Sequence, residues 1–398
     1  NVTGVQTCAL PIYLSDLVLA LPEGNYKLVV IANPTPKLVA RTAVGSPLSQ
    51  LTGYEHYYTD ELATQGSQLT VSLLNEQGPV TVTSAAFSST TPQVRIQMES
   101  VLARVLVYGE PRLAGGAKRG SAPAGYVLSP QARYTAPLRP LGLLRTGGSE
   151  VAGDGSHPED RYPTSRMCQE WKDSAPKSLT ELLSHFALDR MTSHEGGEDI
   201  YQARLLPDEQ ALATAVSNIH AYARETTLPP TAYLVGALPS LVIRFPYIPG
   251  GLTLRENEGW VSFRGKYYTE SQMKEWIRSD DFDDPTLAEA VKAARINEDS
   301  FTAPFEKGDL RFYYRGYNYY VVPIRHFDDT KAPTKTSIGR YGVVRGTEYR
   351  IHLTQILRPG TPVPPDLTAD LTPVAEEKNV HAIVSVRPIV VHSSEIHI

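Results

Sequence analysis

The sequence predicts a mainly β protein made of two consecutive β-sandwich domains with a few short helices. Tyr occurs 22 times, and 31 Pro and 29 Gly divide the chain into short segments, many of which alternate apolar and polar residues. Such alternation is typical of strands with one buried and one exposed face. Strands and helices do not alternate regularly along the sequence, so packed antiparallel sheets are expected. The length of 398 residues, 41% of them hydrophobic, and the net charge of -5 fit two globular domains.

The start of the chain does not read like natural protein. Val2–Ile12 matches the translation of a common sequencing adapter, so we exclude residues 1–12 from fold prediction and treat Tyr13 as the first natural residue. A secretory signal or a lipidated cysteine is then expected upstream of the sequence. Within residues 13–398 Cys168 is the only cysteine, which excludes a disulfide framework and a paired-cysteine zinc motif.

Composition also limits the partners. No apolar run approaches the roughly 20 residues of a membrane helix. No block of basic residues provides an electrostatic footprint for nucleic acid. We therefore expect neither a transmembrane helix within this sequence nor a nucleic-acid partner.

The N-terminal domain is expected to span residues 13–196 and to be truncated at its start. Leu17–Leu21, the turn Pro22–Asn25 and Tyr26–Pro34 read as strand, tight turn and strand. Further strands are expected at residues 68–74, 80–87 and 94–108, and surface loops at residues 109–125 and 145–167.

Helical periodicity is confined to four segments, which we expect to decorate the sheets. In the last of them Leu287, Val291 and Ala294 form one modest apolar stripe. The segments are residues 178–188, 207–223, 270–277 and 285–296.

The C-terminal domain is expected at residues 197–366, followed by a C-terminal strand region at residues 367–398. Its strands are expected at residues 233–235, 241–247, 260–268, 310–314, 319–325, 341–344 and 349–356. Arg358–Asp366 reads as a rigid connector because Pro cannot donate to a strand ladder.

Apolar and polar residues alternate near the end of the chain, which predicts a strand with one buried face. Polar residues at odd positions include His381, Ser385 and Arg387. By itself this pattern predicts a strand that docks in its own domain. The apolar positions are Val380, Ala382, Val384, Val386, Pro388, Val390, Ile396 and Ile398.

The segments Ala103–Val105, Tyr319–Phe327 and Gly339–Ile351 resemble motifs of the fimbrillin family, the subunits of type V pili of Bacteroidales-type bacteria. The resemblance is strongest around residues 317–356 and in the final strand, and Thr226 departs from the Asn of a Glu-Asn-Thr phrase. We expect the motif residues to have structural roles. They are Ala103, Arg104, Val105, Arg325, His326, Phe327, Tyr341, Gly342, Val343, Val344 and Arg345.

The resemblance implies transthyretin-like sandwiches, export as a lipoprotein to the outer membrane and proteolytic removal of an N-terminal strand. We do not assign the cleavage site to Arg41, which lies beyond the strand that ends in Ala32-Asn33. Subunits then polymerise by β-strand exchange into a fimbria that supports adhesion, so the C-terminal strand with the apolar positions Val380–Ile398 either docks in its own domain or is the candidate donor strand for the next subunit. The implied partners are neighbouring copies or other pilus subunits, a processing protease, and a host protein or glycan. No cofactor is implied.

Catalytic signatures are not found: the sequence contains no Gly-x-Ser-x-Gly, no His-Glu-x-x-His and no phosphate loop. Arg104 is interpreted as a sheet-face residue that reaches water or a carboxylate, and not as a ligand contact. His326 is interpreted as a hydrogen-bonded histidine at a sheet edge. We assign no catalytic, cofactor-binding or metal-binding residue.

Two acidic or histidine-containing groups remain as metal candidates. The cluster Asp280, Asp281, Asp283 and Asp284 is a calcium candidate, although a solvated loop with Asp284 capping the next helix is favoured. The tail histidines do not share one strand face, so a metal site there is not favoured; they are His381, His392 and His397.

Two other functions stay open. One is a surface adhesin or glycan-binding module on the same fold that does not polymerise, for which Tyr54, Tyr57 and Tyr58 are suitable contacts. The other is a β-sandwich hydrolase with convergent carboxylates.

Overall fold

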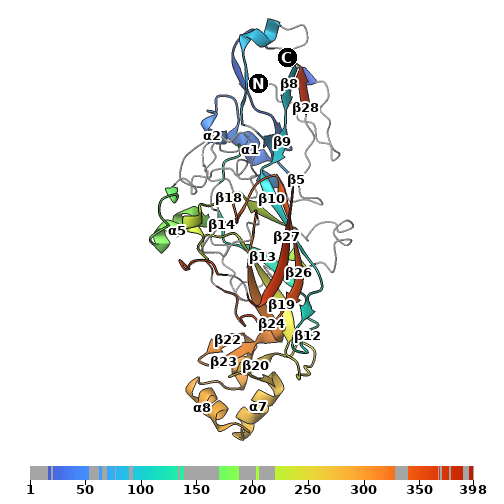
Figure 1. Cartoon of the computed structure of the whole chain (residues 1–398), viewed down its shortest axis with the longest axis vertical. Coiled ribbons are helices and arrows are strands. Elements are labelled where there is room, and N and C mark those ends of the chain that lie inside the picture. Colours follow the sequence, from blue (N-terminus) through green and yellow to red (C-terminus); the bar gives the residue numbers. More distant parts are fainter. Residues whose placement is uncertain are drawn as a thin grey trace.

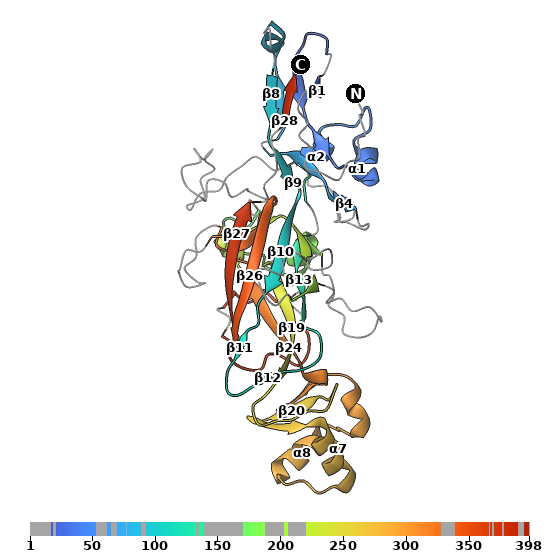
Figure 2. The ribbon, with the colours of Figure 1, turned by 90° about the vertical axis from the view of Figure 1, so that its right-hand side faces the viewer.

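The protein is elongated and has three parts along its long axis (Figures 1 and 2). The N-terminal part also holds the C-terminal strand β28 (Ser394–His397), a sandwich lies in the centre, and a smaller module lies at the opposite end. The computed structural model describes residues 17–18, 21–52, 62–64, 70–76, 78–88, 93–132, 135–138, 170–187, 203–205, 220–327, 339–365, 367, 370–375, 378–388 and 394–397.

The central sandwich consists of two sheets packed face to face. The first has the order β27 (Val380–Pro388), β26 (Thr347–Ile356), β10 (Leu102–Tyr108) and β17 (His220–Arg224), with β11 (Arg112–Leu113) also beside β26. The second has the order β24 (Tyr317–Pro323), β19 (Ser240–Ile248), β13 (Gly125–Ser129) and β16 (Ala203–Arg204), with β12 (Lys118–Arg119) also beside β19.

Alternating side chains of both sheets form the core of this sandwich. The core includes Val105 and Val107 of β10, Tyr349 and Ile351 of β26 and, from the other sheet, Ile243 of β19. All five side chains are nearly inaccessible to solvent. The expected mainly β fold is confirmed.

The strands of this sandwich come from both sides of the expected domain boundary between residues 196 and 197. β10 pairs in parallel with β26, from Arg104 opposite Glu348 to Tyr108 opposite His352. The partition into residues 13–196 and 197–366 therefore does not separate the two sheets. Alternation along one strand reports which face is buried but not which strand lies beside it.

The N-terminal part contains short strands in four small sheets. The expected strand over residues 94–108 divides here into β8 (Gln93–Ile96), β9 (Met98–Ser100) and β10. The sheets are β1 (Leu17–Val18) with β28 and β8; β2 (Tyr26–Leu28) with β7 (Val80–Val82); β3 (Ile31–Ala32) with β6 (Leu73–Asn75) and β9; and β4 (Ala63–Thr64) with β5 (Thr70–Val71).

Two helices cover the N-terminal core. α1 (Pro36–Arg41) begins where the Thr35 hydroxyl accepts a hydrogen bond from Leu38 N at 3.0 Å, and Pro36 suits the first turn. α2 (Ser49–Thr52) and the 3-10 turn η1 (Ser84–Ser88) are shorter.

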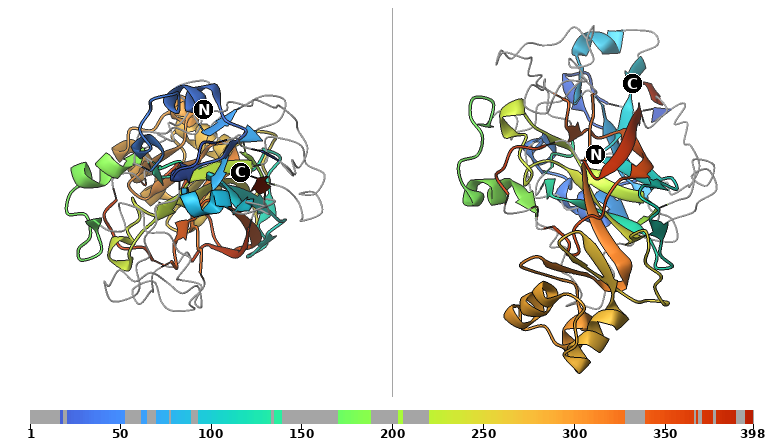
Figure 3. Two further views of the ribbon diagram at one scale, coloured as in Figure 1. Left: turned by 90° about the horizontal axis from the view of Figure 1, so that it is seen from above. Right: turned by 60° about the horizontal axis from the view of Figure 1, so that its bottom comes forward.

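The module at the far end is inserted between β19 and β24. Its sheet has the order β21 (Lys266–Thr269), β20 (Trp260–Phe263), β23 (Leu310–Tyr313) and β22 (Phe305–Lys307). α7 (Glu270–Ser279), α8 (Pro285–Ala293) and η4 (Glu298–Thr302) complete it, and α7 and α8 lie at its outer end (Figure 3).

This module corrects one expectation from the sequence. The segment expected as one strand over residues 260–268 is a hairpin of β20 and β21, and residues 310–313 form β23, but these strands do not belong to the second sandwich. Val261, Phe263 and Phe312 instead bury one face of a separate sheet against Met273 and Leu287 of the helices.

The remaining elements lie beside the sandwich. They are α5 (Leu179–His185), β14 (Gln131–Ala132) paired with β15 (Phe186–Ala187), β18 (Thr226–Thr227) paired with β25 (Gly342–Val343), η3 (Pro230–Ala232) and η5 (Tyr314–Gly316). The expectation of a helix through residues 207–223 is wrong at its end, because residues 220–223 belong to strand β17 and pair with β10. Residues 206–219 lie outside the described part of the chain.

Candidate functional site

The strand β27 completes the first sheet of its own molecule. It pairs antiparallel with β26 from Thr347 opposite Pro388 to Ile356 opposite Val380, with one irregularity between Leu353 and Gln355. Val380 is buried, and the partly buried Ala382 and Val384 pack against the sandwich core.

The expected alternation of β27 holds over its first half and then shifts. Ile383 is 59% exposed, as an odd position should be, but Val386 is also 37% exposed. Among the described residues these are two of the few large hydrophobic side chains that face solvent. Of the other candidate positions, Pro388 ends β27, Ile396 lies in β28, and Val390 and Ile398 lie outside the described residues.

β28 is the last strand of the chain, but it lies in the N-terminal part of the molecule, between the strands β1 and β8. It pairs antiparallel with β8, from Ser394 opposite Ile96 to His397 opposite Gln93. On its other side it pairs in parallel with β1, where Ile396 is opposite Leu17.

The apolar cluster beside β8 and β9 is small and incompletely shielded from water. Ile96 and Met98 are buried in it. The surrounding side chains are only partly buried; they are Leu28, Val30, Ala32, Leu73, Val80 and Val94. This part of the molecule therefore presents short strands and accessible apolar groups beside the edge that β28 occupies.

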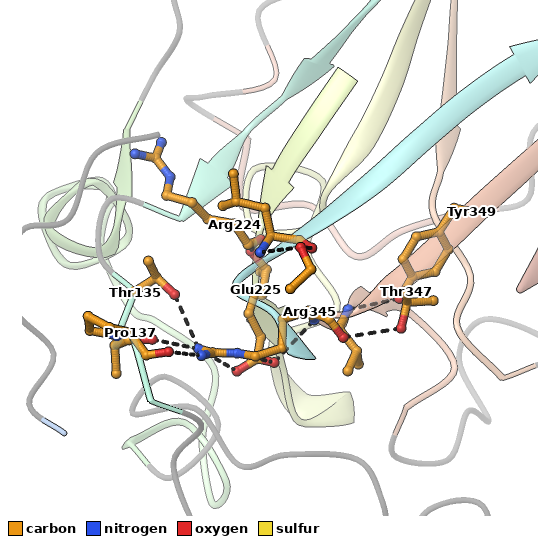
Figure 4. Close-up of polar contacts among 12 residues, drawn as sticks. Thr135, Pro137, Arg224, Glu225, Arg345, Thr347 and Tyr349 are labelled. Carbon is orange, nitrogen blue, oxygen red and sulfur yellow. Dashed lines mark hydrogen bonds and ion pairs between the residues drawn. The ribbon is translucent and has the colours of Figure 1, made fainter. Parts of the chain in front are cut away.

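Arg345 forms a buried polar cluster that joins motif residues far apart in the sequence (Figure 4). Its Nε donates to Glu225 Oε2 at 3.1 Å, and its backbone N donates to the same oxygen at 3.2 Å. Its guanidinium also donates to the carbonyl oxygens of Pro137 at 2.6 Å and Ala136 at 2.7 Å. The two charged side chains are 1% and 3% exposed.

The segment bound by Arg345 leads into the N-terminal part. Leu138 N donates to Leu51 O of α2 at 2.9 Å, and the Leu138 side chain is buried in the N-terminal core. Gly346 adopts a positive φ of 65°, which favours glycine, and its N–H donates to Leu102 O at the start of β10. The cluster thus joins the sandwich to the N-terminal part.

Tyr349 organises a second group of motif residues. Its hydroxyl lies 2.7 Å from His326 Nδ1 and accepts a hydrogen bond from Val344 N at 2.8 Å. The backbones of Arg325 and Tyr341 form an isolated antiparallel β-bridge. The hydrogen-bonded histidine predicted from the sequence is confirmed.

Phe327 and the two strand residues of the motif complete this group. Phe327 N donates to Gly339 O at 2.8 Å, and its ring meets that of His326 edge-on. Val343 and Gly342 pair with β18.

Arg104 lies along the outer face of the first sheet. It forms an ion pair with Glu348 of the neighbouring strand, and the same carboxylate binds Arg350. Burial raises the pKa of the Tyr222 hydroxyl, and the nearby Arg104 opposes that shift. Ala103 and Val105 point into the core. The prediction that Arg104 reaches a carboxylate is confirmed.

The acidic loop of the module is structural. Asp284 caps α8 by accepting from Thr286 N at 3.0 Å and binds Lys266 Nζ at 3.0 Å; hydrogen bonds from these two partners hold its pKa well below the ordinary value. Asp280 binds Lys292 at 2.9 Å. The predicted cap is confirmed, and no group of three metal-ligating side chains occurs within the ranges described.

Several residues suggested from the sequence as adhesin contacts or metal ligands lie outside the described part of the chain. Tyr54, Tyr57, Tyr58 and His392 lie outside the described residues, whereas His381 is exposed on β27. Within the described segments, the helices lack the length and apolar character of a membrane span.

An aromatic junction between module and sandwich was not found from the sequence. Trp260 is completely buried, stacks on Tyr313 at 3.7 Å between ring centroids and donates to Tyr247 O at 2.9 Å. The Tyr313 hydroxyl donates to Gly360 O at 3.0 Å, and burial raises its pKa. Three tryptophans in the chain are too few to form a pattern, so the sequence offered no signal for this contact.

Comparison with known families gives a match at the C-terminal end of the chain. Residues 311–395 match the family described as major fimbrial subunit protein type IV, fimbrillin, C-terminal. This region contains β24, β25, β26 and β27 and most of the motif residues. A search of curated proteins finds no match.

Three solved structures are similar to the chain at low identity. A candidate cell adhesion protein from Parabacteroides distasonis has 12% identity and a TM-score of 0.39, with 92% of this chain and 84% of that chain covered. A fimbrillin from Porphyromonas gingivalis has 16% identity, a TM-score of 0.36 and coverages of 92% and 81%. A candidate cell adhesion protein from Bacteroides eggerthii has 12% identity, a TM-score of 0.37 and coverages of 93% and 78%.

All three TM-scores lie below 0.5. The family match rests on sequence and falls on the strands and turns described above. The C-terminal region of the chain, residues 311–395, therefore matches the fimbrillin family.

Proposed function

We propose that this chain is a structural subunit of a cell-surface fimbria and polymerises by β-strand exchange. The observation that supports this most is the place of β28, which pairs on both sides with strands from the other end of the sequence. A strand of this composition therefore fits that position. The same backbone pairs form equally well when β28 comes from a neighbouring copy.

The N-terminal part has the features of an acceptor. β8 has only four residues, and the side chains around Ile96 and Met98 are incompletely buried. An added strand satisfies backbone N–H and C=O groups and shields apolar surface at the same time. A polymer joined in this way dissociates slowly because all pairs of one strand must break together.

The burial of β27 limits which residues are exchanged. Val380 belongs to the sandwich core, and β27 pairs with β26 along its whole length. Donating β27 would open this core, whereas releasing β28 leaves it intact. We therefore place the exchanged segment after Pro388.

The remaining steps follow from the family. Export as a lipoprotein to the outer membrane, removal of an upstream strand by a protease and a role in adhesion complete the proposal. Neighbouring copies or other pilus subunits are the partners, and no described residue group favours the adhesin-only or hydrolase alternatives.

Deletion of residues 394–398 tests the proposal. We expect the shortened chain to keep the urea-unfolding midpoint of its sandwich and to form no polymer, because the donor is lost while β27 remains. Polymer is measured as a ladder on a gel of unboiled samples and by electron microscopy. Ladders from the shortened chain as abundant as those from the full chain would contradict strand exchange through β28.

A further inference from the structure

We infer that the docked β28 is an autoinhibitory contact. It makes the donor strand and the acceptor edge of the same molecule unavailable for assembly at the same time. This inference rests on the proposed function. In the monomer β28 occupies the backbone edge of β8 and the side of β1. These are the groups that an incoming strand needs. One intramolecular pairing therefore inactivates both ends of the assembly reaction.

The short tether favours the closed form. β27 ends at Pro388 and β28 begins at Ser394, so five residues (389–393) connect them. A segment joined to its site by few residues of the same chain has an effective concentration on the order of millimolar there. A strand from another copy at micromolar concentration competes poorly with it.

The closed form can open without unfolding the sandwich. β28 pairs through four residues with β8 and through two with β1, and the cluster beneath contains, among the residues whose burial is described, two buried hydrophobic residues, Ile96 and Met98. Short terminal strands over small cores belong to the least stable parts of a fold. β27, with nine residues and a buried Val380, stays in place.

The inference makes a kinetic prediction. If opening limits assembly, the initial rate per subunit does not change with subunit concentration, because undocking is unimolecular. An open monomer would instead assemble at a rate per subunit that rises with concentration.

A disulfide across the register tests the contact itself. Arg95 and Glu395 are directly opposite in β8 and β28. The variant R95C/E395C is made in the full chain with Cys8→Ser and Cys168→Ser, so that no other thiol reacts. Its matched control, K27C/T81C, places the same bond across β2 and β7, where both residues are exposed and opposite each other.

Under mild oxidation at low concentration we expect R95C/E395C to form the disulfide within one chain, at a yield that does not change on dilution. The oxidised chain should form at least ten-fold less polymer than the reduced chain, and reductant should restore assembly. Oxidised K27C/T81C should polymerise like its reduced form.

Two results overturn the inference. One is a disulfide that forms between chains only and is lost on dilution; the other is an oxidised R95C/E395C chain that assembles at the rate of its reduced form. A reduced chain that never polymerises overturns the proposed function, and the inhibitory role with it, whereas the crosslink within one chain still reports on docking.

Discussion

Arg345 shows how one residue of the family motif determines the arrangement of distant segments. Its guanidinium is 1% exposed and binds a carboxylate and two carbonyl oxygens from segments more than a hundred positions away. Arg suits this position because its planar group offers five donors in a fixed geometry. Lys would leave acceptors of Pro137 or Ala136 without a donor.

Arg345→Met tests this role. The substitution leaves Glu225 buried without its cation, so the free energy of unfolding should fall by about 3–5 kcal/mol, as for other broken buried pairs. Urea unfolding followed by circular dichroism measures it. The double variant R345M/E225L should recover part of the loss because no charge then remains buried.

The matched control is Arg264→Met. Arg264 binds Asp309 at 2.8 Å, but the two side chains are 62% and 56% exposed. Exposed pairs contribute little to stability. A loss for R345M no larger than that for R264M would contradict the structural role of the cluster.

Tyr313 makes the stability of the folded chain sensitive to pH in the alkaline range. Burial raises its pKa above the ordinary 10.0, so the folded state holds the neutral hydroxyl more strongly than the unfolded chain does. This contribution is fully present below pH 10 and is lost as the pH rises through the higher folded pKa. Tyr247 and Tyr222 act in the same direction.

We expect the free energy of unfolding to fall above pH 10 and to fall less steeply in Tyr313→Phe. Urea unfolding at a series of pH values, followed by the fluorescence of Trp260 and the other tryptophans, measures both slopes. Parallel curves for the two proteins would show that Tyr313 titrates alike in the folded and unfolded states.

At the scale of elements, β27 has two faces with different energetic roles. Val380 is 3% exposed and Ile383 is 59% exposed on the same strand. Val380→Ala should therefore cost roughly 2 kcal/mol of unfolding free energy through lost burial. Ile383→Ala should change it by less than about 0.5 kcal/mol. Equal losses in urea unfolding would indicate that β27 is not docked on β26.

Local patterns in the sequence predicted individual elements well. The alternation at Val380–Val384 and the cap at Asp284 each depend on neighbours in the chain or on one face of one strand. The helix expected to run to residue 223 fails because β17 is selected by its pairing with β10, and tertiary pairing overrides local periodicity.

The partners of the strands could not be predicted from the same patterns. Arg104 and Glu348, which lie in adjacent strands, are separated by 244 positions. The strand at Trp260 was assigned to the sandwich, although its partners lie within its own module. The C-terminal tail could also be predicted only in part. Its alternation predicts a strand, but its division into a docked β27 and a separate β28 follows only from the three-dimensional pairing.

At the scale of the whole molecule, the elements proposed for assembly gather at one end. β1, β8 and β28 lie together at the top of the molecule, and the module with α7 and α8 lies at the opposite end (Figures 1 and 2). The Arg345 cluster lies between the N-terminal part and the sandwich and connects the two. Strand exchange at the top therefore leaves the module away from the exchanged strands.

The most direct test of strand exchange is isotope pairing of the crosslink between β8 and β28. Heavy and light R95C/E395C chains are mixed while reduced, assembled, oxidised, and digested for mass spectrometry of the disulfide-linked peptides from purified filaments. Exchange predicts heavy–light pairs as frequent as pairs of one label, because each β28 docks on another molecule. Filaments whose linked peptides always carry a single label would contradict strand exchange, since every β28 would then still be docked on its own chain.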